Sequence, residues 1–68
     1  MFKKNLFRSA VVANGKTFRD VACALGINEV TLSRKIHGKS DFTRNEIQII
    51  RGFLNLSYDD VESIFFGE

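Results

Sequence analysis

Small polar and basic side chains crowd one short stretch of the chain, GINEVTLSRKIHGKS at residues 26–40. Hydroxyl, guanidinium, ammonium and imidazole groups donate hydrogen bonds, and the cationic ones attract polyanions. On a helix such groups can bind the phosphates and base edges of a nucleic acid, or they can form an ordinary solvated face. The residues concerned are Thr31, Ser33, Arg34, Lys35, His37 and Lys39.

The charge of the chain is divided between its two parts. The net charge is +2 and the isoelectric point is about 9.0. Up to Arg44 nine Lys and Arg stand against three acids, a balance of +6, whereas from Asn45 onward one Arg stands against five acids, a balance of −4. This asymmetry indicates a polyanionic partner on one side of the molecule, or a solvated surface that is asymmetric by chance.

The composition excludes several kinds of site. Cys23 is the only cysteine and His37 the only histidine, so the chain can form neither an internal disulfide nor a four-ligand zinc site. A lone thiol is typical of a reducing, cytoplasmic setting, and we expect Cys23 to be a small packing residue. No set of nucleophile, base and acid and no glycine-rich phosphate loop occurs. We therefore expect no enzyme activity, no cofactor and no small-molecule ligand.

The length of 68 residues predicts a single domain, 1–68, with a modest core. No apolar run approaches the roughly 20 residues that span a bilayer. The lysines near the start are not followed by an apolar run, so we expect neither a signal peptide nor a membrane partner.

Helix signals dominate the chain. Three apolar-periodic segments begin with the capping-box pattern, a hydroxyl residue followed three positions later by an acid, and Asn28 is a fourth cap candidate. With the helix-stopping Asn14-Gly15, these signals predict a compact all-α fold. The boxes are Thr17 with Asp20, Thr43 with Glu46, and Ser57 with Asp60. The predicted helices cover residues 2–14, 18–25, 29–37, 44–54 and 58–66.

Apolar spacing assigns an inner face to each predicted helix. In the first, Phe2, Leu6, Ala10 and Ala13 share one face, flanked by Phe7 and Val11. In the fourth, Ile47, Ile50 and Leu54 form one face and Ile49, Phe53 and Leu56 a second, which predicts enclosure on both sides. In the fifth, the stripe comprises Tyr58, Val61, Ile64 and Phe65, and Phe66 lies off it.

The second and third predicted helices form a helix-turn-helix. The second directs Val21, Ala22 and Leu25 inward, and the third directs Leu32 and Ile36 inward, one turn apart. Ala22 is small enough for the third helix to cross closely. Gly26 supplies the conformational freedom that a short turn between two helices requires.

The segment TFRDVACALGINEVTLSRKIHGKS resembles the helix-turn-helix of lambda-repressor-like, Cro-type regulators of phages and bacteria. The matching residues are Thr17, Val21, Ala22, Gly26, Ile27, Asn28, Thr31, Leu32, Ser33, Gly38 and Lys39. The closing segment FTRNEIQIIRGFLNLSYDDVESIFF resembles small Cro-like or modulator proteins from phages of Gram-positive bacteria. The resemblance implies a five-helix DNA-binding domain with the helix-turn-helix in its second and third helices.

The resemblance also implies roles for individual residues. The third helix would enter the major groove of double-stranded operator DNA. Its base-reading residues would be Glu29, Val30, Thr31, Ser33 and Arg34. Phosphates would be held by Thr17, Phe18, His37, Lys39, Ser40 and Arg44. A homodimer or partner contact would involve Tyr58, Phe65 and Phe66.

Two functions of different class follow. The first is a sequence-specific transcriptional regulator, a Cro-like repressor that acts as a dimer by occupying its operator. The second is a phage modulator or antirepressor that keeps this fold but acts mainly by binding a partner repressor protein. Phe18 in place of a usual polar residue, the acidic Glu29, the acidic second part of the chain and Phe66 favour the second function.

Overall fold

The predicted hydroxyl caps set the starts of three helices in the computed structural model, which describes residues 1–67. The Asp20 backbone amide donates to Thr17 Oγ1 at 3.2 Å, and the Thr17 amide donates to Asp20 Oδ2 at 2.8 Å. The other two predicted boxes show the same reciprocal pair of bonds. Asn28 Oδ1 accepts from the Thr31 amide at 2.8 Å, so the fourth cap is confirmed too.

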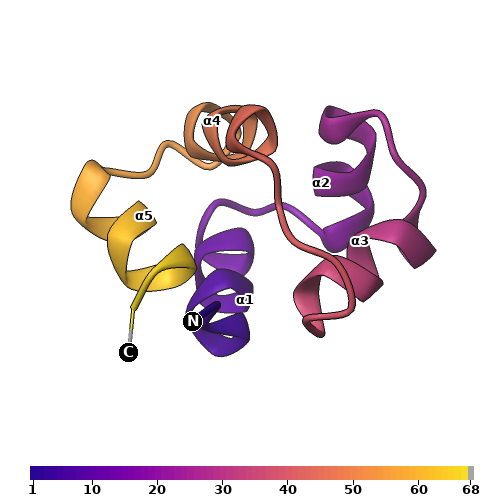
Figure 1. Ribbon diagram of the computed structural model, residues 1–68. Coiled ribbons are helices and arrows are strands. Elements are labelled where there is room, and N and C mark those ends of the chain that lie inside the picture. The colour runs from indigo at the N-terminus through magenta and orange to yellow at the C-terminus, as the bar shows by residue number, and fades with distance from the viewer. Residues whose placement is uncertain (68) are drawn as a thin grey trace.

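The described part of the chain, residues 1–67, is all-helical and contains no strand, as predicted (Figure 1). Every helix boundary falls within two residues of its predicted range. In the same residues no helix combines the length and the apolar character that crossing a membrane requires. The helices are α1 (Lys4–Ala13), α2 (Phe18–Leu25), α3 (Glu29–Ile36), α4 (Arg44–Phe53) and α5 (Tyr58–Phe65).

The helices are arranged with α2 against both α3 and α4, and with α1 against α5 (Figure 1). The turn of residues 26–28 is short because Gly26 adopts a left-handed conformation, with φ of 71°. The Ile27 amide then donates back to the Ala22 carbonyl at 3.0 Å, which closes the end of α2 as the next helix begins.

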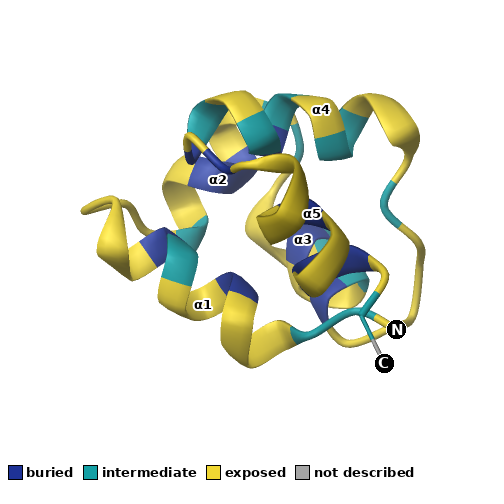
Figure 2. Cartoon of the chain, turned by 90° about the vertical axis from the view of Figure 1, so that its left-hand side faces the viewer, coloured by how far each residue is buried: buried dark blue, intermediate teal, exposed yellow. Residues whose placement is uncertain are grey.

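The core lies between all five helices, with buried residues on their inward faces (Figure 2). Phe7 of α1 is 0% exposed, and its ring lies within 5.4–6.4 Å, centroid to centroid, of four other aromatic rings. Those rings come from the start of the chain, α2, the loop between α3 and α4, and α5, so one side chain joins four parts of the molecule. They belong to Phe2, Phe18, Phe42 and Phe65.

The inner face predicted for α1 is wrong, because the helix is rotated about its axis relative to the prediction. Phe7 and Val11 are the buried residues, whereas Leu6 is 47% exposed and Ala13 is exposed. A phenylalanine buries more apolar area than a leucine, and Phe7 finds four aromatic neighbours in the core. These contacts decide which face turns inward.

Two further assignments are also wrong. Tyr58 does not join the buried stripe of α5 but is 71% exposed, and its ring centroid lies 4.0 Å from the Arg51 guanidinium. Cys23 is exposed rather than packed, since Val21 and Ala22 occupy the inward face of α2.

The enclosure of α4 is less complete than predicted. Ile50 and Leu54 are buried, as expected of the first face. On the second face Leu56 is buried, but Ile49 and Phe53 are only half-buried.

An ion pair ties α3 to the start of α4. Lys35 Nζ lies 3.1 Å from Glu46 Oε1, and the two side chains are 11% and 15% exposed. Lys35 also donates to the Asp41 carbonyl at 3.0 Å. Burial by itself raises the pKa of Glu46, but the hydrogen bond from the Thr43 backbone and the pairing with Lys35 prevail and lower it from the ordinary value of 4.5. The pair therefore stabilises the fold above that value, and its contribution is lost as pH falls through the lowered pKa.

Replacing Glu46 by Gln removes the charge but keeps an acceptor for the Thr43 amide. We expect Glu46→Gln to lower the free energy of unfolding by about 1–3 kcal/mol at pH 7, between the values for exposed and for buried pairs, because Lys35 loses its counter-ion. The difference from wild type should shrink below about pH 4.5, as the wild-type carboxylate is protonated. Urea unfolding at several pH values measures both effects.

The matched control is Asp20→Asn, which changes a capping acid that has no ion pair within residues 1–67. It should show a smaller loss of stability. A Glu46→Gln loss that stays constant down to about pH 3 would contradict the role assigned to the charge pair.

Candidate nucleic-acid interface

The outer face of α3 lies opposite the side chains that this helix places in the core. Leu32 is 1% exposed and Ile36 is 9% exposed, so both are held in the core. At about 100° per residue, Val30 and Arg34 lie on the opposite side of the helix. Both are exposed, and Val30 keeps 64% of its surface in solvent although it is apolar. An apolar and a cationic side chain one turn apart, on a rigidly held helix, can contact base edges together.

The other predicted base-reading residues lie around this face. Ser33 is exposed and Thr31 is half-buried. Glu29 is exposed at the first position of α3 but stands about 140° from Arg34 around the helix axis, because five residues separate them. Glu29 and Arg34 therefore lie on different sides of the helix. Glu29 can reach a groove only from the N-terminal end of α3.

The segment after α3 carries the predicted phosphate contacts. Gly38 has φ of 79°, and the Lys39 amide donates to the Arg34 carbonyl at 2.8 Å, so the start of this segment is held against α3. Lys39, Ser40 and Arg44 are exposed. Arg44 is the first residue of α4, where the helix dipole disfavours a cation and favours an anion, so a phosphate bound there would relieve the repulsion.

At the start of α2, backbone amides rather than side chains are available to bind an anion. The Thr17 hydroxyl accepts from the Asp20 amide in the capping box. The Phe18 ring stacks on Phe7 at 5.7 Å with an interplanar angle of 18°. What this end can present to an anion is therefore the first backbone amides of the helix, which have no acceptor within it.

Lys35 differs from the other cations of the stretch. Its ammonium group is taken up by Glu46, by the Asp41 carbonyl and by the Phe42 ring, whose centroid lies 5.9 Å away. Arg34 and Lys39 make no ion pair within residues 1–67. Among the cations of residues 26–40, Lys35 is therefore structural, whereas Arg34 and Lys39 remain accessible.

Sequence reasoning missed a group of residues beside the end of α3. Lys4, Asn5 and Arg8 of α1 line a hollow of about 310 Å³ together with His37. Lys4 and Arg8 are four residues apart, so the sequence places them on one helix face. Nothing in the sequence shows that α1 packs with this face next to α3.

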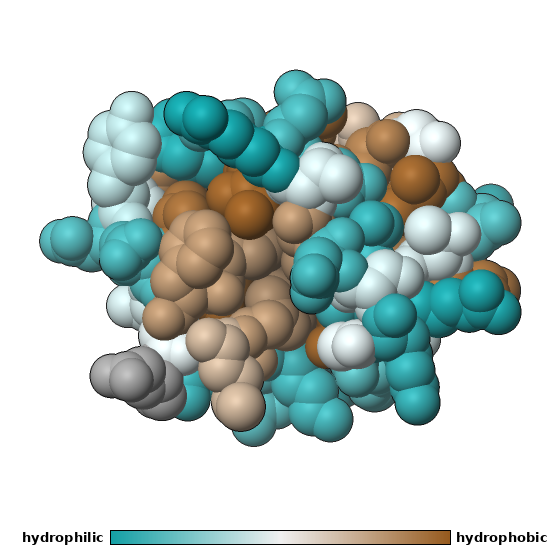
Figure 3. Space-filling view, in the orientation of Figure 1, coloured by the Kyte–Doolittle hydropathy of each residue, from teal (hydrophilic) through white to brown (hydrophobic). Residues whose placement is uncertain are grey.

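The predicted dimer or partner residues divide between surface and core. Phe66 is 57% exposed, whereas Phe65 is only 7% exposed and belongs to the core. Phe66 adjoins Met1, Phe2 and Ile47 around one shallow hollow, and this face of the molecule shows an apolar patch (Figure 3). Phe66, not Phe65, is therefore the residue that can reach a partner here.

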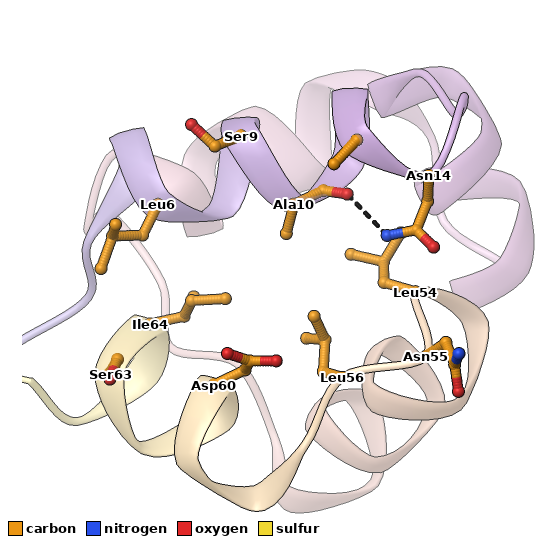
Figure 4. A pocket seen from close by; sticks show the side chains of 11 residues that line it. Leu6, Ser9, Ala10, Asn14, Leu54, Asn55, Leu56, Asp60, Ser63 and Ile64 are labelled. Carbon is orange, nitrogen blue, oxygen red and sulfur yellow. Dashed lines mark hydrogen bonds between the residues drawn. The ribbon is translucent and has the colours of Figure 1, made fainter.

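A second apolar hollow, of about 530 Å³, lies between α1, α5 and the segment joining α4 to α5 (Figure 4). Leu6, Leu54, Leu56 and Ile64 form its walls, with Asp60 at its edge. No group of three His, Cys, Asp or Glu that could hold a metal ion occurs in residues 1–67.

No protein-family model matches the chain, and comparisons with curated proteins and with solved structures find no significant match.

Replacing Phe66 by Ala tests whether the apolar patch associates. Because Phe66 is largely outside the core, we expect Phe66→Ala to shift sedimentation toward the monomer while helicity stays nearly unchanged. Val12→Ala is the matched control, because Val12 is a 67% exposed hydrophobic residue that does not line this hollow. A wild-type protein that is monomeric at high concentration, or a Phe66→Ala variant that unfolds, would contradict the assignment.

Proposed function

We propose that the protein is a sequence-specific DNA-binding transcriptional regulator, a Cro-like repressor that acts by occupying its operator. The observation that carries the proposal is the outer face of α3. Leu32 and Ile36 anchor the helix in the core, and Val30 and Arg34 project on the opposite side without any protein partner in residues 1–67.

In this proposal α2 and α3 form a lambda-repressor-like helix-turn-helix. Buried Ala22 and the left-handed Gly26 support it, because they allow the two helices to cross closely after a short turn. The major groove of B-form DNA is wide enough to admit an α-helix. The helix α3 enters it with its N-terminal residues foremost, as recognition helices of this class do.

The side chains of α3 then read bases by their chemistry. Arg34 donates two hydrogen bonds to the O6 and N7 atoms of a guanine. Val30 packs against the methyl group of a thymine, which suits an exposed apolar side chain. Glu29, at the end of the helix, accepts from the exocyclic amine of a cytosine.

Phosphate contacts flank these bases. Lys39 and Arg44 hold one strand, and the free backbone amides at Phe18 hold a phosphate at the start of α2. Two copies related by a two-fold axis, joined through Phe66, read half-sites about one helical turn apart.

The apolar patch supports a second candidate function, that of a modulator or antirepressor. Phe66 and Met1 are 57% and 83% exposed, and together with Phe2 and Ile47 they form a surface that a partner repressor could cover. A binding selection separates the two candidates. A protein that selects no DNA sequence but binds a repressor from the same genome tightly has the second function.

Arg34→Ala tests base reading. We expect a binding selection from randomised duplexes to return a guanine opposite Arg34 for the wild type and no preference at that position for the variant, a loss of about 1–3 kcal/mol of discrimination. Lys39→Ala is the matched contrast, because a lost phosphate contact weakens binding to all sequences alike and lowers the log–log salt slope by about one. An unchanged selected sequence in Arg34→Ala would remove Arg34 from the base contacts.

Glu29→Gln tests the end of the recognition helix separately. Glutamine pairs with the N6 and N7 atoms of adenine, so the preference at one position should move from cytosine to adenine. Because Glu29 and Arg34 stand on different sides of α3, the guanine preference should persist in this variant. The same selection measures both positions, and a cytosine preference that survives the change would show that Glu29 does not contact that base.

A further inference from the structure

Two basic side chains of α1 lie against the end of α3 without a counter-charge. Lys4 and Arg8 are four residues apart on one face of α1 and line the hollow of about 310 Å³. Like charges at this spacing repel each other by a few tenths of a kcal/mol. No acid lines the hollow, and neither residue makes an ion pair within residues 1–67.

The imidazole of His37 is a third nitrogen-bearing side chain at the same hollow. It follows the last residue of α3 and lines this hollow, and together with Lys4 it lines an adjoining hollow that reaches Gly38. Side chains of two elements about thirty residues apart in sequence therefore converge. Such a convergence of donors without an acidic side chain suits an anion.

Two apolar side chains form the floor of the hollow. Ile36 is 9% exposed, and the Phe18 ring is stacked on Phe7. An apolar floor reduces local screening, which strengthens hydrogen bonds from Arg8 or Lys4 to a bound anion. Phe18 is also the first residue of α2, so the start of that helix lies next to the hollow.

We infer that the hollow between Lys4, Arg8 and His37 binds a backbone phosphate of the DNA next to the bases that α3 reads, an inference that rests on the proposed function. The Arg8 guanidinium can hold two phosphate oxygens at once, and Lys4 adds a compact charge. His37 stands on the exposed side of α3, one turn beyond Ser33, which places the hollow beside the proposed groove contacts.

Lys4→Gln and Arg8→Gln test the inference, with the wild-type selected duplex as the probe. Each variant should lower the log–log salt slope by about 0.9 and weaken binding roughly eightfold at 0.1 M salt. The selected base sequence should not change, because phosphate contacts carry no sequence information. Arg8→Lys, which keeps the charge, should restore most of the slope.

The matched control is Lys16→Gln, which removes the same charge at a different place. Lys16 lies over the Phe53 ring, 5.1 Å from its centroid, and lines a separate hollow. An equal decrease of the salt slope in Lys16→Gln would show that the slope depends on net charge and not on the hollow, and would overturn the inference. Unchanged slopes in Lys4→Gln and Arg8→Gln would also overturn it, while base selection by the wild type would leave the proposed function standing. A wild-type protein that binds no duplex at low salt would refute both.

Discussion

The packing of Phe7 is the constraint on which the rest of the structure depends. Its ring is fully buried and meets four other rings, which come from the chain start, α2, the loop after α3 and α5. In a domain of this size each large buried side chain supplies a considerable share of the stability. Through these contacts Phe7 joins α2 and the loop after α3 to α1.

The same packing explains why an aromatic residue stands at the start of α2. Phe18 fills the core beside Phe7 instead of presenting a polar side chain to solvent. Its position brings the start of α2, the end of α3 and the basic face of α1 around one hollow. Phe18 itself offers no polar group to a phosphate. The proposed phosphate contact is instead made by Lys4, Arg8 and His37, which line the same hollow as the Phe18 ring.

The cations of residues 26–40 serve two purposes. Lys35 binds Glu46 and the Asp41 carbonyl of the loop between them, and so links α3 to the start of α4. Arg34 is its direct neighbour but lies about 100° further round the helix and remains accessible. The apolar surface around Phe66 is formed by other elements than the outer face of α3. Ser40 also lines the hollow around Phe66, and Met1 and Phe2 line both this hollow and the one beside Lys4 and His37, so the proposed contacts with DNA and with a second protein chain adjoin at these residues.

The sequence by itself determined the features that depend on neighbours along the chain. Capping boxes and a left-handed glycine act within three or four residues, so the all-helical class, the helix boundaries and the inward face of α3 were predictable. Only the tertiary structure decided the rotation of α1, the exposure of Tyr58, the commitment of Lys35 to Glu46 and the meeting of Lys4 and Arg8 with the end of α3. Each of these depends on which distant residues pack together. Such contacts are set by the filling of a shared core, which periodicity within one helix does not encode.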